Sequence, residues 1–532
     1  MGTSQPSSGA TSKRHEKATE KRLVAGSFLF KIPDNDAKKA RVALFRRSSK
    51  VRTYQHKLAP LSGSVEASDV NPLATAIREI QEETTLTTSS IELLRVGKPY
   101  SFVDDSIGRE WSINPFAFRL KDVKEGGEGE QGIVLDWEHD GIEWFDPLEI
   151  NESDKFGGVP KLVNSLRRVW PEYDLGAAAA RILTDRLQTL RDDHQSEARQ
   201  VAAAALTALR AVIEHMDSSQ SIDELWWARV RMAAWHLCKA RKSMDAAIAN
   251  VIVKALDRLE MIVRDHTNST DKVSQMMKAI DNQLDDGNNI TDRICNSFVE
   301  YLRHNVLLGT STRRTVSILT LSNSSSISQC VRNSAALLGI QLDLRILESR
   351  PLCEGVTPAS ELLDNAKDNS LLKVTLFSDA SSATAAQDID LVVLGADQIN
   401  SSGDVSSRAG SLPAILSAKH IAPDSKVVIL SETEKICGPG HVNDHLMEHN
   451  SLEELLQTWT GAVSSAEAVD DARRNNDDSA ERKVKVKNTY FEWIPTRLID
   501  AYVTEEGSLT PEKITERSSW FFKETNRFFD GL

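Results

Sequence analysis

Three glutamates lie close together in the first third of the chain, within little more than one helical turn. Glu79, Glu82 and Glu83 follow Arg78, and Gly63 lies in the loop before them. Three carboxylates at this spacing repel one another unless a cation lies among them. Carboxylate oxygens are the ligands that Mg²⁺ and similar hard cations prefer, so these residues indicate a divalent metal and phosphate chemistry. Glu82 and Glu83 taken alone would favour only a solvated acidic face.

One helix must carry these carboxylates. Asn71 is a typical N-cap residue, and Pro72 suits the first helical position, where no N–H is needed. An apolar stripe at helical spacing then predicts the face that packs inward. The stripe consists of Leu73, Ile77, Ile80 and Thr84. At about 100° per residue the glutamates fall on the opposite side, and Arg78 lies beside them, where it can hold a carboxylate in a bidentate pair.

The segment resembles the Nudix box, in which a glycine loop leads into Arg-Glu, two further residues and Glu-Glu. The matching residues are Gly63, Arg78, Glu79, Glu82 and Glu83. The resemblance implies that Glu79, Glu82 and Glu83 hold Mg²⁺ or Mn²⁺. It also implies that one of them, or a carboxylate elsewhere, helps water to attack the diphosphate linkage of a nucleoside diphosphate derivative.

Two positions depart from the family pattern. Thr85 stands where the family has a glycine after Glu-Glu. The acidic residue expected in the loop is Asp69, which is correctly spaced from Gly63 but lies one residue too far from Arg78. A one-residue insertion would account for the second departure. The motif therefore predicts the Nudix fold, and hydrolysis follows if the chain accommodates both positions.

The segments around the box have the pattern of β-strands. The expected strands are 23–30, 41–45, 111–118 and 143–147. Glu138 and His139 could reach the carboxylates, or they could belong to an ordinary loop before the last strand. We expect a Nudix domain, an α/β/α sandwich, at 22–160. The preceding residues 1–21 are rich in Ser, Thr, Lys and Glu and should be disordered.

The whole chain has the composition of a globular protein with several domains. Its 532 residues exceed one ordinary domain. With 64 Lys and Arg against 77 Asp and Glu, the net charge is −13, which argues against a general nucleic-acid or membrane-surface binder. No apolar run is long enough to span a bilayer. Five cysteines without a CxxC pair favour a reducing compartment, so we expect a cytoplasmic protein.

The remaining two thirds of the chain change from a helical to an alternating pattern. Residues 176–305 are rich in Ala and Leu with polar faces and predict a helical subdomain. Short apolar runs then alternate with helical or polar segments over 306–530, which indicates a Rossmann-like parallel sheet. The runs are 316–321, 342–347, 373–377, 391–394 and 427–430. The charged, Asn/Asp-rich stretch 463–487 should be a flexible insertion. Ligands bind beyond the carboxyl ends of such strands.

Several motifs in this half resemble one family, which contains the α, β and δ subunits of translation initiation factor 2B and two sugar-phosphate isomerases. One isomerase acts on methylthioribose 1-phosphate and the other on ribose 1,5-bisphosphate. The motifs are residues 346–355, 394–399, 403–405, 490–495 and 503–507, with Arg241 to Met244 in the helical part. The resemblance covers roughly residues 180 to 525.

The resemblance implies a binding site for a phosphorylated pentose or a nucleotide. The implied residues are Ser322, Asn323, Arg350, Asp397 and Arg408. Asp397 matches the catalytic aspartate of the isomerases, but Ser322 stands where they have cysteine, and Ser407-Arg408 replace an Asn-Lys pair. Serine is a poorer acid, base or nucleophile than cysteine unless something activates it, so we expect binding, and isomerisation only with such activation. Asp397 could equally cap a strand-end loop.

Four residues late in the chain recur at every fourth position. Cys437, His441, His445 and His449 could align metal ligands on a helix. However, Gly438-Pro439-Gly440 breaks a helix after Cys437, and no second ligand cluster is evident. The role of these four residues stays open.

The main expectation is a Nudix-type hydrolase joined to a phosphosugar-binding, isomerase-like domain that forms a homodimer. One alternative is a regulatory relative of the initiation factor 2B subunits, which would assemble with those subunits and use its Nudix half as a nucleotide sensor. A second alternative is an active aldose–ketose phosphosugar isomerase. The sequence does not name the Nudix substrate.

Overall fold

The computed structural model divides into two compact units, one built mainly from residues up to Arg181 and one from Ile182 onward. The structure describes residues 20–33, 39–193, 196, 198–216, 221–241, 244–265, 271–308, 315–364, 371–439, 453–460 and 486–532. Most of the N-terminal stretch 1–21 and of the insertion 463–487 therefore lies outside the described residues, as do His441, His445 and His449. None of the described helices is both long and apolar enough to cross a bilayer.

The first unit contains an eight-stranded sheet with the strand order β3-β2-β1-β7-β5, to which β4, β6 and β8 add by pairing with β1, β7 and β2. The long strands β1 and β7 run parallel, and the other pairs are antiparallel. The strands are β1 (Glu20–Lys31), β2 (Arg41–Arg47), β3 (Leu58–Ala59), β4 (Leu61–Ser64), β5 (Ile91–Val96), β6 (Tyr100–Asp104), β7 (Arg109–Leu120) and β8 (His139–Phe145). All four predicted strands are therefore present.

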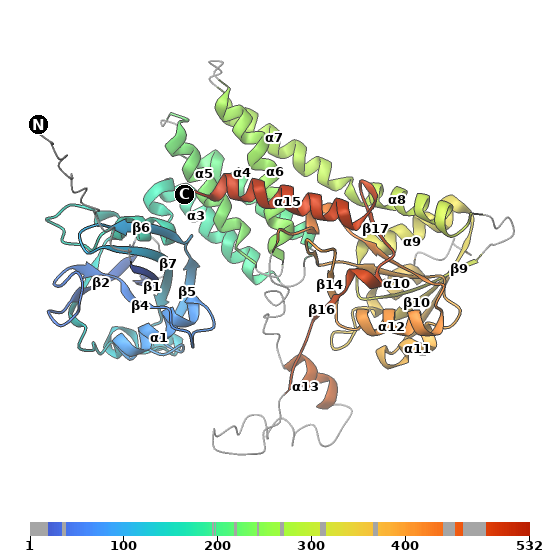
Figure 1. Ribbon diagram of the computed structural model, residues 1–532, viewed down its shortest axis with the longest axis horizontal. Coiled ribbons are helices and arrows are strands. Elements are labelled where there is room, and N and C mark those ends of the chain that lie inside the picture. Colours follow the sequence, from blue (N-terminus) through green and yellow to red (C-terminus); the bar gives the residue numbers. More distant parts are fainter. Residues whose placement is uncertain are drawn as a thin grey trace, which may run out of the picture. The chain divides into compact units, whose positions relative to one another are not determined.

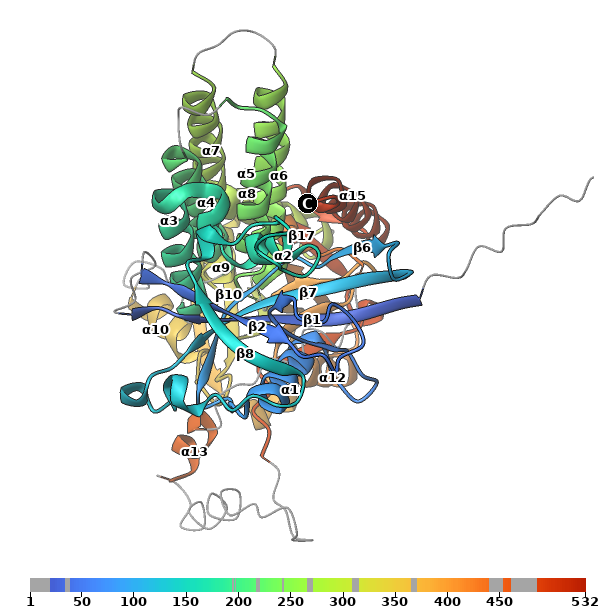
Figure 2. The ribbon, with the colours of Figure 1, turned by 90° about the vertical axis from the view of Figure 1, so that its left-hand side faces the viewer.

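Helices cover both faces of this sheet. Leu29 of β1 packs in a core cluster with Ile80 of α1 (Pro72–Thr84), whereas its neighbour Phe28 packs in a second cluster with Leu166 of α2 (Leu162–Val169). Successive strand residues point to opposite faces, so one strand supplies both clusters. Figure 2 shows α1 and α2 on opposite sides of the sheet. The predicted α/β/α sandwich is confirmed.

The second unit begins with a helical layer, as the sequence predicts. The helices are α3 (Glu172–Asp192), α4 (Ala198–His215), α5 (Glu224–Cys238), α6 (Asp245–Arg264), α7 (Lys272–Asn288) and α8 (Ile290–Asn305). The C-terminal helix α15 (Pro511–Phe529) returns to this layer and packs against α5 and α6 (Figure 1). The helical subdomain is thus completed by a segment from the far end of the chain.

A seven-stranded sheet follows, with the order β11-β10-β9-β12-β15-β17-β18, in which every neighbouring pair except β17–β18 is parallel. Its strands are β9 (Thr315–Leu321), β10 (Gln341–Leu347), β11 (Leu372–Phe377), β12 (Leu391–Gly395), β15 (Lys426–Leu430), β17 (Ala501–Thr504) and β18 (Gly507–Leu509). The first five are the predicted apolar runs. The chain that follows β12 forms a separate small sheet, which consists of β13 (Gln398–Ile399), β14 (Val405–Arg408) and β16 (Phe491–Ile494). The Rossmann-like prediction is confirmed.

Helices again cover both faces of the sheet. Ile318 of β9 belongs to a core cluster that includes residues of α8 and α9, whereas the next residue, Leu319, belongs to a cluster that includes residues of α12. The helices between strands are α9 (Ser325–Leu338), α10 (Val356–Asp364), α11 (Ser382–Ala385) and α12 (Ser411–Ile421), and α13 (Glu453–Thr460) lies between β15 and β16 in the sequence. Burial on both faces of this kind explains why apolar residues on these strands are not confined to alternate positions.

Candidate functional site

The helix that carries the carboxylates begins at the predicted residue. The side chain of Asn71 accepts a hydrogen bond from the Ala74 N–H, and Pro72 occupies the first turn, which confirms the predicted cap. The helix ends at Thr85, whose φ of 64° is left-handed. Glycine adopts this conformation without strain. The threonine at this position is therefore accommodated in the backbone geometry that the family's glycine would adopt freely.

Gly63 and Glu79 approach each other very closely. Gly63 lies on β4, and a Cβ atom added to it would be 1.8 Å from both Cδ and Oε1 of Glu79. No larger residue could stand at position 63 with Glu79 in this place. The absence of a side chain at Gly63 is what lets the Glu79 carboxylate lie against the strand.

Arg78 pairs with several of the surrounding carboxylates. Its guanidinium lies 2.8 Å from Glu79, 3.0 Å from Glu82 and 3.1 Å from Asp69. Asp69 also accepts hydrogen bonds from the Thr75 hydroxyl and from the backbone of Glu66. The hydrogen bond from Arg78 is the main reason that the pKa of Asp69 lies far below its usual value. The extra residue in the loop therefore does not prevent Asp69 from reaching the box.

The three glutamates have different surroundings. The Glu82 side chain is 58 % exposed, whereas those of Glu79 and Glu83 are 14 % and 4 % exposed. Burial raises the pKa of Glu79 to about 7, and the charge of Glu83 adds to this increase. Burial also raises the pKa of Glu83, with further contributions from Glu138 and Asp136. Negative charge thus accumulates at the inner end of the site.

Glu83 is held by His139, the first residue of β8. Nε2 of His139 lies 2.7 Å from Oε2 of Glu83, and both side chains are buried. Burial lowers the pKa of His139. Of the two alternatives for His139, contact with the carboxylates is therefore the one observed, while Glu138 and Asp136 act on Glu83 through their charge. Asp136 could not be predicted from the sequence, because it lies in a loop without a motif.

The described residues contain no group of three Asp, Glu, His or Cys side chains that converge as metal ligands. Glu79 and Glu82 instead turn to Arg78, and Glu83 turns to His139. The chemistry of the donor set nevertheless fits a divalent cation, because burial and the charge of Glu83 raise the pKa of Glu79, and a cation would offset both effects.

A second candidate site lies where the strand order of the second unit reverses. The chain adds β10 and β11 on one side of β9 and then places β12 on its other side. Ligands bind at such a switch point, outside the carboxyl ends of the strands. Ser322 and Asn323 follow β9 there, and Asp397 follows β12. A Cβ on Gly395 would lie 3.9 Å from the Ser324 hydroxyl, so the two strand ends are close together.

Glu354 joins two of the implied phosphosugar residues. The Ser322 hydroxyl donates to Oε2 of Glu354 over 2.8 Å, and Oε1 of Glu354 lies 3.0 Å from the Arg408 guanidinium. Ser322 has a left-handed φ of 69°, and Arg408 stacks on the ring of Phe491. Sequence reasoning assigned no role to Glu354, although its place before Gly355 in a matched motif was a usable signal.

The other implied residues are less closely associated. Arg350 lines a small cavity of about 20 Å³ together with Glu354 and Arg408. The Arg350 side chain is 56 % exposed and pairs with Glu348. Asn323 is exposed. The backbone N–H of Asp397 donates to the Ser406 carbonyl, and its carboxylate has no hydrogen bond or ion pair with any described residue. The structure thus brings together Ser322, Arg350 and Arg408, and leaves Asp397 available.

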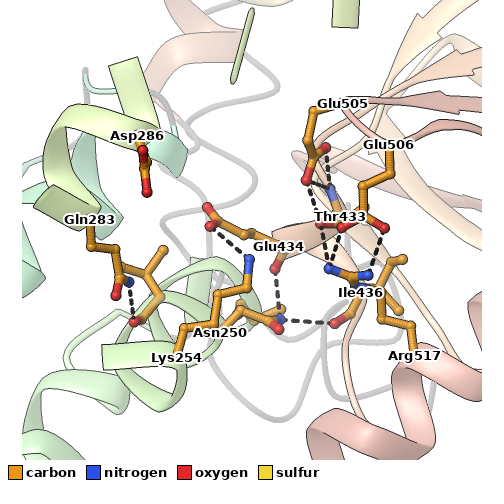
Figure 3. A network of polar contacts seen from close by, with 12 residues as sticks. Asn250, Lys254, Gln283, Asp286, Thr433, Glu434, Ile436, Glu505, Glu506 and Arg517 are labelled. Carbon is orange, nitrogen blue, oxygen red and sulfur yellow. Dashed lines mark hydrogen bonds and ion pairs between the residues drawn. The ribbon is translucent and has the colours of Figure 1, made fainter. Parts of the chain in front are cut away.

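The helical subdomain is attached to this end of the sheet by a polar network in the segment after β15 (Figure 3). Asn250 of α6 donates to the carbonyls of Glu434 and Ile436, and Lys254 lies 3.1 Å from the Glu434 carboxylate. On the other side Arg517 of α15 bonds Thr433. Nearby, Cys437 donates its thiol to the Ile399 carbonyl.

Two family models match the chain. The model of the NUDIX domain matches residues 30–166, and that of the initiation factor 2 subunit family matches residues 194–511. The second match alone spans more than half of the chain.

Curated relatives match the second region. The methylthioribose-1-phosphate isomerase of Fusarium vanettenii is 27 % identical over 227 residues, which cover 40 % of this chain and 56 % of that protein. The ribose 1,5-bisphosphate isomerase of Haloferax volcanii is 28 % identical over 198 residues, which cover 37 % and 54 %. The chain thus spans about half the length of these relatives. A solved structure, the translation initiation factor eIF-2B of Pyrococcus horikoshii OT3, is 17 % identical with a TM-score of 0.44 and covers 63 % of this chain and 98 % of that one.

Proposed function

Because the chain belongs to the initiation factor 2 subunit family and carries a NUDIX domain before it, we propose that it is a metal-dependent hydrolase of nucleoside diphosphate derivatives, joined to a phosphosugar-binding domain. The observation that carries the hydrolase part is the contact between Gly63 and Glu79, in which the absence of a side chain at Gly63 leaves room for the Glu79 carboxylate. Glu79, Glu82 and Glu83 would hold Mg²⁺ or Mn²⁺. The bound ion would neutralise charge that develops on the diphosphate.

The chain's own residues prepare this site in the absence of the ion. Arg78 keeps the carboxylates of Asp69, Glu79 and Glu82 within one group by pairing with all three. Without a bound cation, burial raises the pKa of Glu79 to about 7, and a divalent ion held by this carboxylate would lower that pKa. We assign Glu79, with Glu82 and Glu83, to the catalytic set.

A hydrolysis screen of nucleotide sugars, dinucleotides and dinucleoside polyphosphates with Mg²⁺ or Mn²⁺ tests this proposal. Glu82→Gln should abolish the activity found, and because Glu82 is exposed the variant should fold normally. The matched control is Glu149→Gln, an exposed glutamate of the same unit outside the box. Activity that survives in Glu82→Gln would place the catalytic site elsewhere.

The second domain is proposed to bind a phosphorylated pentose or a nucleotide at the switch point. Ser322, Asn323 and Asp397 stand at the adjoining ends of β9 and β12, which supports this location. Cleavage of a nucleotide sugar such as ADP-ribose would yield a phosphorylated pentose, so the two domains could act on related compounds. Calorimetric titration of the full chain with pentose phosphates and with AMP tests the idea, and an absence of any binding heat would end it.

The isomerase reaction itself has one observation in its favour. The carboxylate of Glu354 accepts the hydrogen bond of the Ser322 hydroxyl, which is the kind of partner that a serine needs in order to react. Turnover of ribose 1,5-bisphosphate or methylthioribose 1-phosphate that is lost in Asp397→Asn would establish an active isomerase.

The alternative function is regulatory. Ser322 in place of a reactive cysteine favours a subunit that has no isomerase activity and that senses nucleotides through its NUDIX half. Such a protein would co-purify with other subunits of the initiation factor exchange complex, whereas a separate homodimer would support the metabolic role.

A further inference from the structure

A local irregularity of β8 decides which residue of this strand faces α1, the helix that carries the three glutamates. β8 pairs with β2 in regular register from Phe145 to Gly141. Arg47 of β2 then pairs with His139, so that Asp140 has no opposite residue on β2. This extra residue is a β-bulge. Bulges redirect side chains and occur often beside functional sites.

The bulge places His139 in the interior. Ile142 and Trp144 pack in the same core cluster as Ile80 of α1, so regular alternation would turn Asp140 to that side. Asp140 is instead exposed, and the ring of His139 lies 5.3 Å from that of Phe45 in this core. The insertion of one residue has therefore exchanged an aspartate for an imidazole beside the carboxylates.

The hydrogen-bonding pattern identifies the proton of the imidazole. Nε2 of His139 contacts Oε2 of Glu83, whereas Nδ1 is buried and has no partner among the described residues. If the proton were on Nδ1, a buried N–H would be unsatisfied, and two lone pairs would face each other at Nε2. In the cation-bound state, in which Glu83 is ionised, a proton on Nε2 satisfies the carboxylate and leaves only an acceptor unpaired, which costs less.

Glu83 needs such a donor. Its carboxylate is buried and is repelled by the charges of Asp136 and Glu138, while the charge of Arg47 and the backbone N–H of Ser62 offset only part of this cost. Without the His139 donor, one side of the buried carboxylate would have no hydrogen bond, and the group would rotate away or take up a proton, so that it would be lost as a ligand.

We propose that His139 is a positioning residue, which holds Glu83 through its Nε2–H so that this carboxylate keeps a fixed orientation for a divalent cation. The inference rests on the proposed function, in which Glu83 is a metal ligand. It goes beyond the box motif, because it assigns the orientation of one ligand to a residue that lies 56 positions further along the chain.

Two substitutions of opposite character separate this role from simple packing. His139→Phe keeps an aromatic ring against Phe45 but removes the donor. His139→Gln loses the ring but can place an amide N–H near the position of Nε2. If His139 positions Glu83, His139→Phe should weaken Mn²⁺ binding and His139→Gln should bind Mn²⁺ nearly as tightly as wild type. If His139 only packs, His139→Gln should bind Mn²⁺ more weakly than His139→Phe.

The experiment is a titration of the full chain with Mn²⁺, followed by electron paramagnetic resonance, with thermal unfolding as a check that each variant is folded. We expect the Kd for Mn²⁺ to rise by about 10-fold or more in His139→Phe and to stay within about threefold in His139→Gln, as is usual for residues that orient metal ligands. Equal Mn²⁺ binding by wild type and His139→Phe, or weaker binding in Gln than in Phe, would overturn the inference.

The same titration distinguishes failure of the inference from failure of the proposed function. If the wild-type chain binds no Mn²⁺, or if Glu82→Gln binds it as tightly as wild type does, the metal site itself is wrong. If wild type binds and Glu82→Gln does not, the result for His139→Phe bears on the positioning role alone. If His139→Phe does not fold, His139→Leu replaces it, because leucine also lacks a hydrogen-bond donor. The Kd of this variant for Mn²⁺ is judged in the same way.

Discussion

Replacing Gly63 with alanine should inactivate the NUDIX domain without unfolding it. The added Cβ would lie 1.8 Å from the carboxylate of Glu79, whereas real Cβ contacts essentially never fall below 3.0 Å. The carboxylate must therefore retreat by about 1.2 Å. The atoms that must move are the far end of a flexible side chain, and Gly63 does not have a positive φ, so the backbone can stay in place.

The size of the effect follows from this displacement. Misplacing a catalytic group by about 1 Å can cost about 10²-fold in rate. We therefore expect kcat/KM of the hydrolysis to fall about 10²-fold in Gly63→Ala, which corresponds to about 2.7 kcal/mol of transition-state stabilisation. The Kd for Mn²⁺ should rise in parallel, because Glu79 is one of the proposed ligands.

The control is Gly26→Ala on the adjacent strand β1. A Cβ there would meet only Ile113, at 3.9 Å, which is an ordinary contact. Both variants should melt within a few degrees of wild type, and only Gly63→Ala should lose activity. Full activity in Gly63→Ala would show that the position of Glu79 does not matter for catalysis. Equal losses of activity in both variants would show that β1 and β4 do not tolerate substitution of glycine, and that the reasoning from Glu79 is wrong.

Three further predictions concern stability. Thr85→Gly should stabilise the first unit by about 1 kcal/mol, seen as a rise of about 3 °C in its calorimetric transition, because glycine adopts the left-handed φ of 64° without strain; an unchanged or lower transition would contradict this. Lys254→Met should destabilise the second unit by about 3 kcal/mol near pH 8, because it leaves a buried carboxylate unpaired. Burial raises the pKa of Glu434 in the folded state, so the stability that this group contributes is lost as pH rises. The loss of unfolding free energy caused by Lys254→Met, measured by urea unfolding, should therefore become smaller toward pH 5, where Glu434 takes up a proton. A loss that does not change with pH would refute the assignment. Asn250→Ala should cost about 3 kcal/mol at every pH, since it leaves two buried carbonyls unpaired, and a cost below 1 kcal/mol would mean that water replaces the amide.

The sequence predicts the strands that carry a continuous apolar run, including the edge strand β11, in which no residue is fully buried. The five apolar runs of the second half became strands because both faces of that sheet are covered. Strands β5 and β6 were not predicted, since most residues of β5 are only partly buried and those of β6 alternate between partly buried and exposed. Propensity is a weak signal for such half-buried strands.

The same division applies to the candidate sites. The Nudix box could be read from the sequence because its residues lie on one helix and the loop before it. The inward orientation of His139 could not, since it depends on a bulge that exists only in the pairing of β8 with β2. The link from Ser322 through Glu354 to Arg408 joins three separate loops and likewise depends on the tertiary fold.

The return of α15 to the helical layer has a consequence for the order of folding. Arg527 pairs with Asp257, which lies 270 residues earlier, and Phe521 and Phe528 of α15 are buried. During synthesis on the ribosome, the surfaces of α5 and α6 that α15 covers remain in contact with water until nearly the whole chain has emerged. Contacts over such long separations form slowly, because a long loop must close before they contribute. This exposed helical surface is therefore where a chaperone would bind the nascent chain, and where an incomplete chain would aggregate.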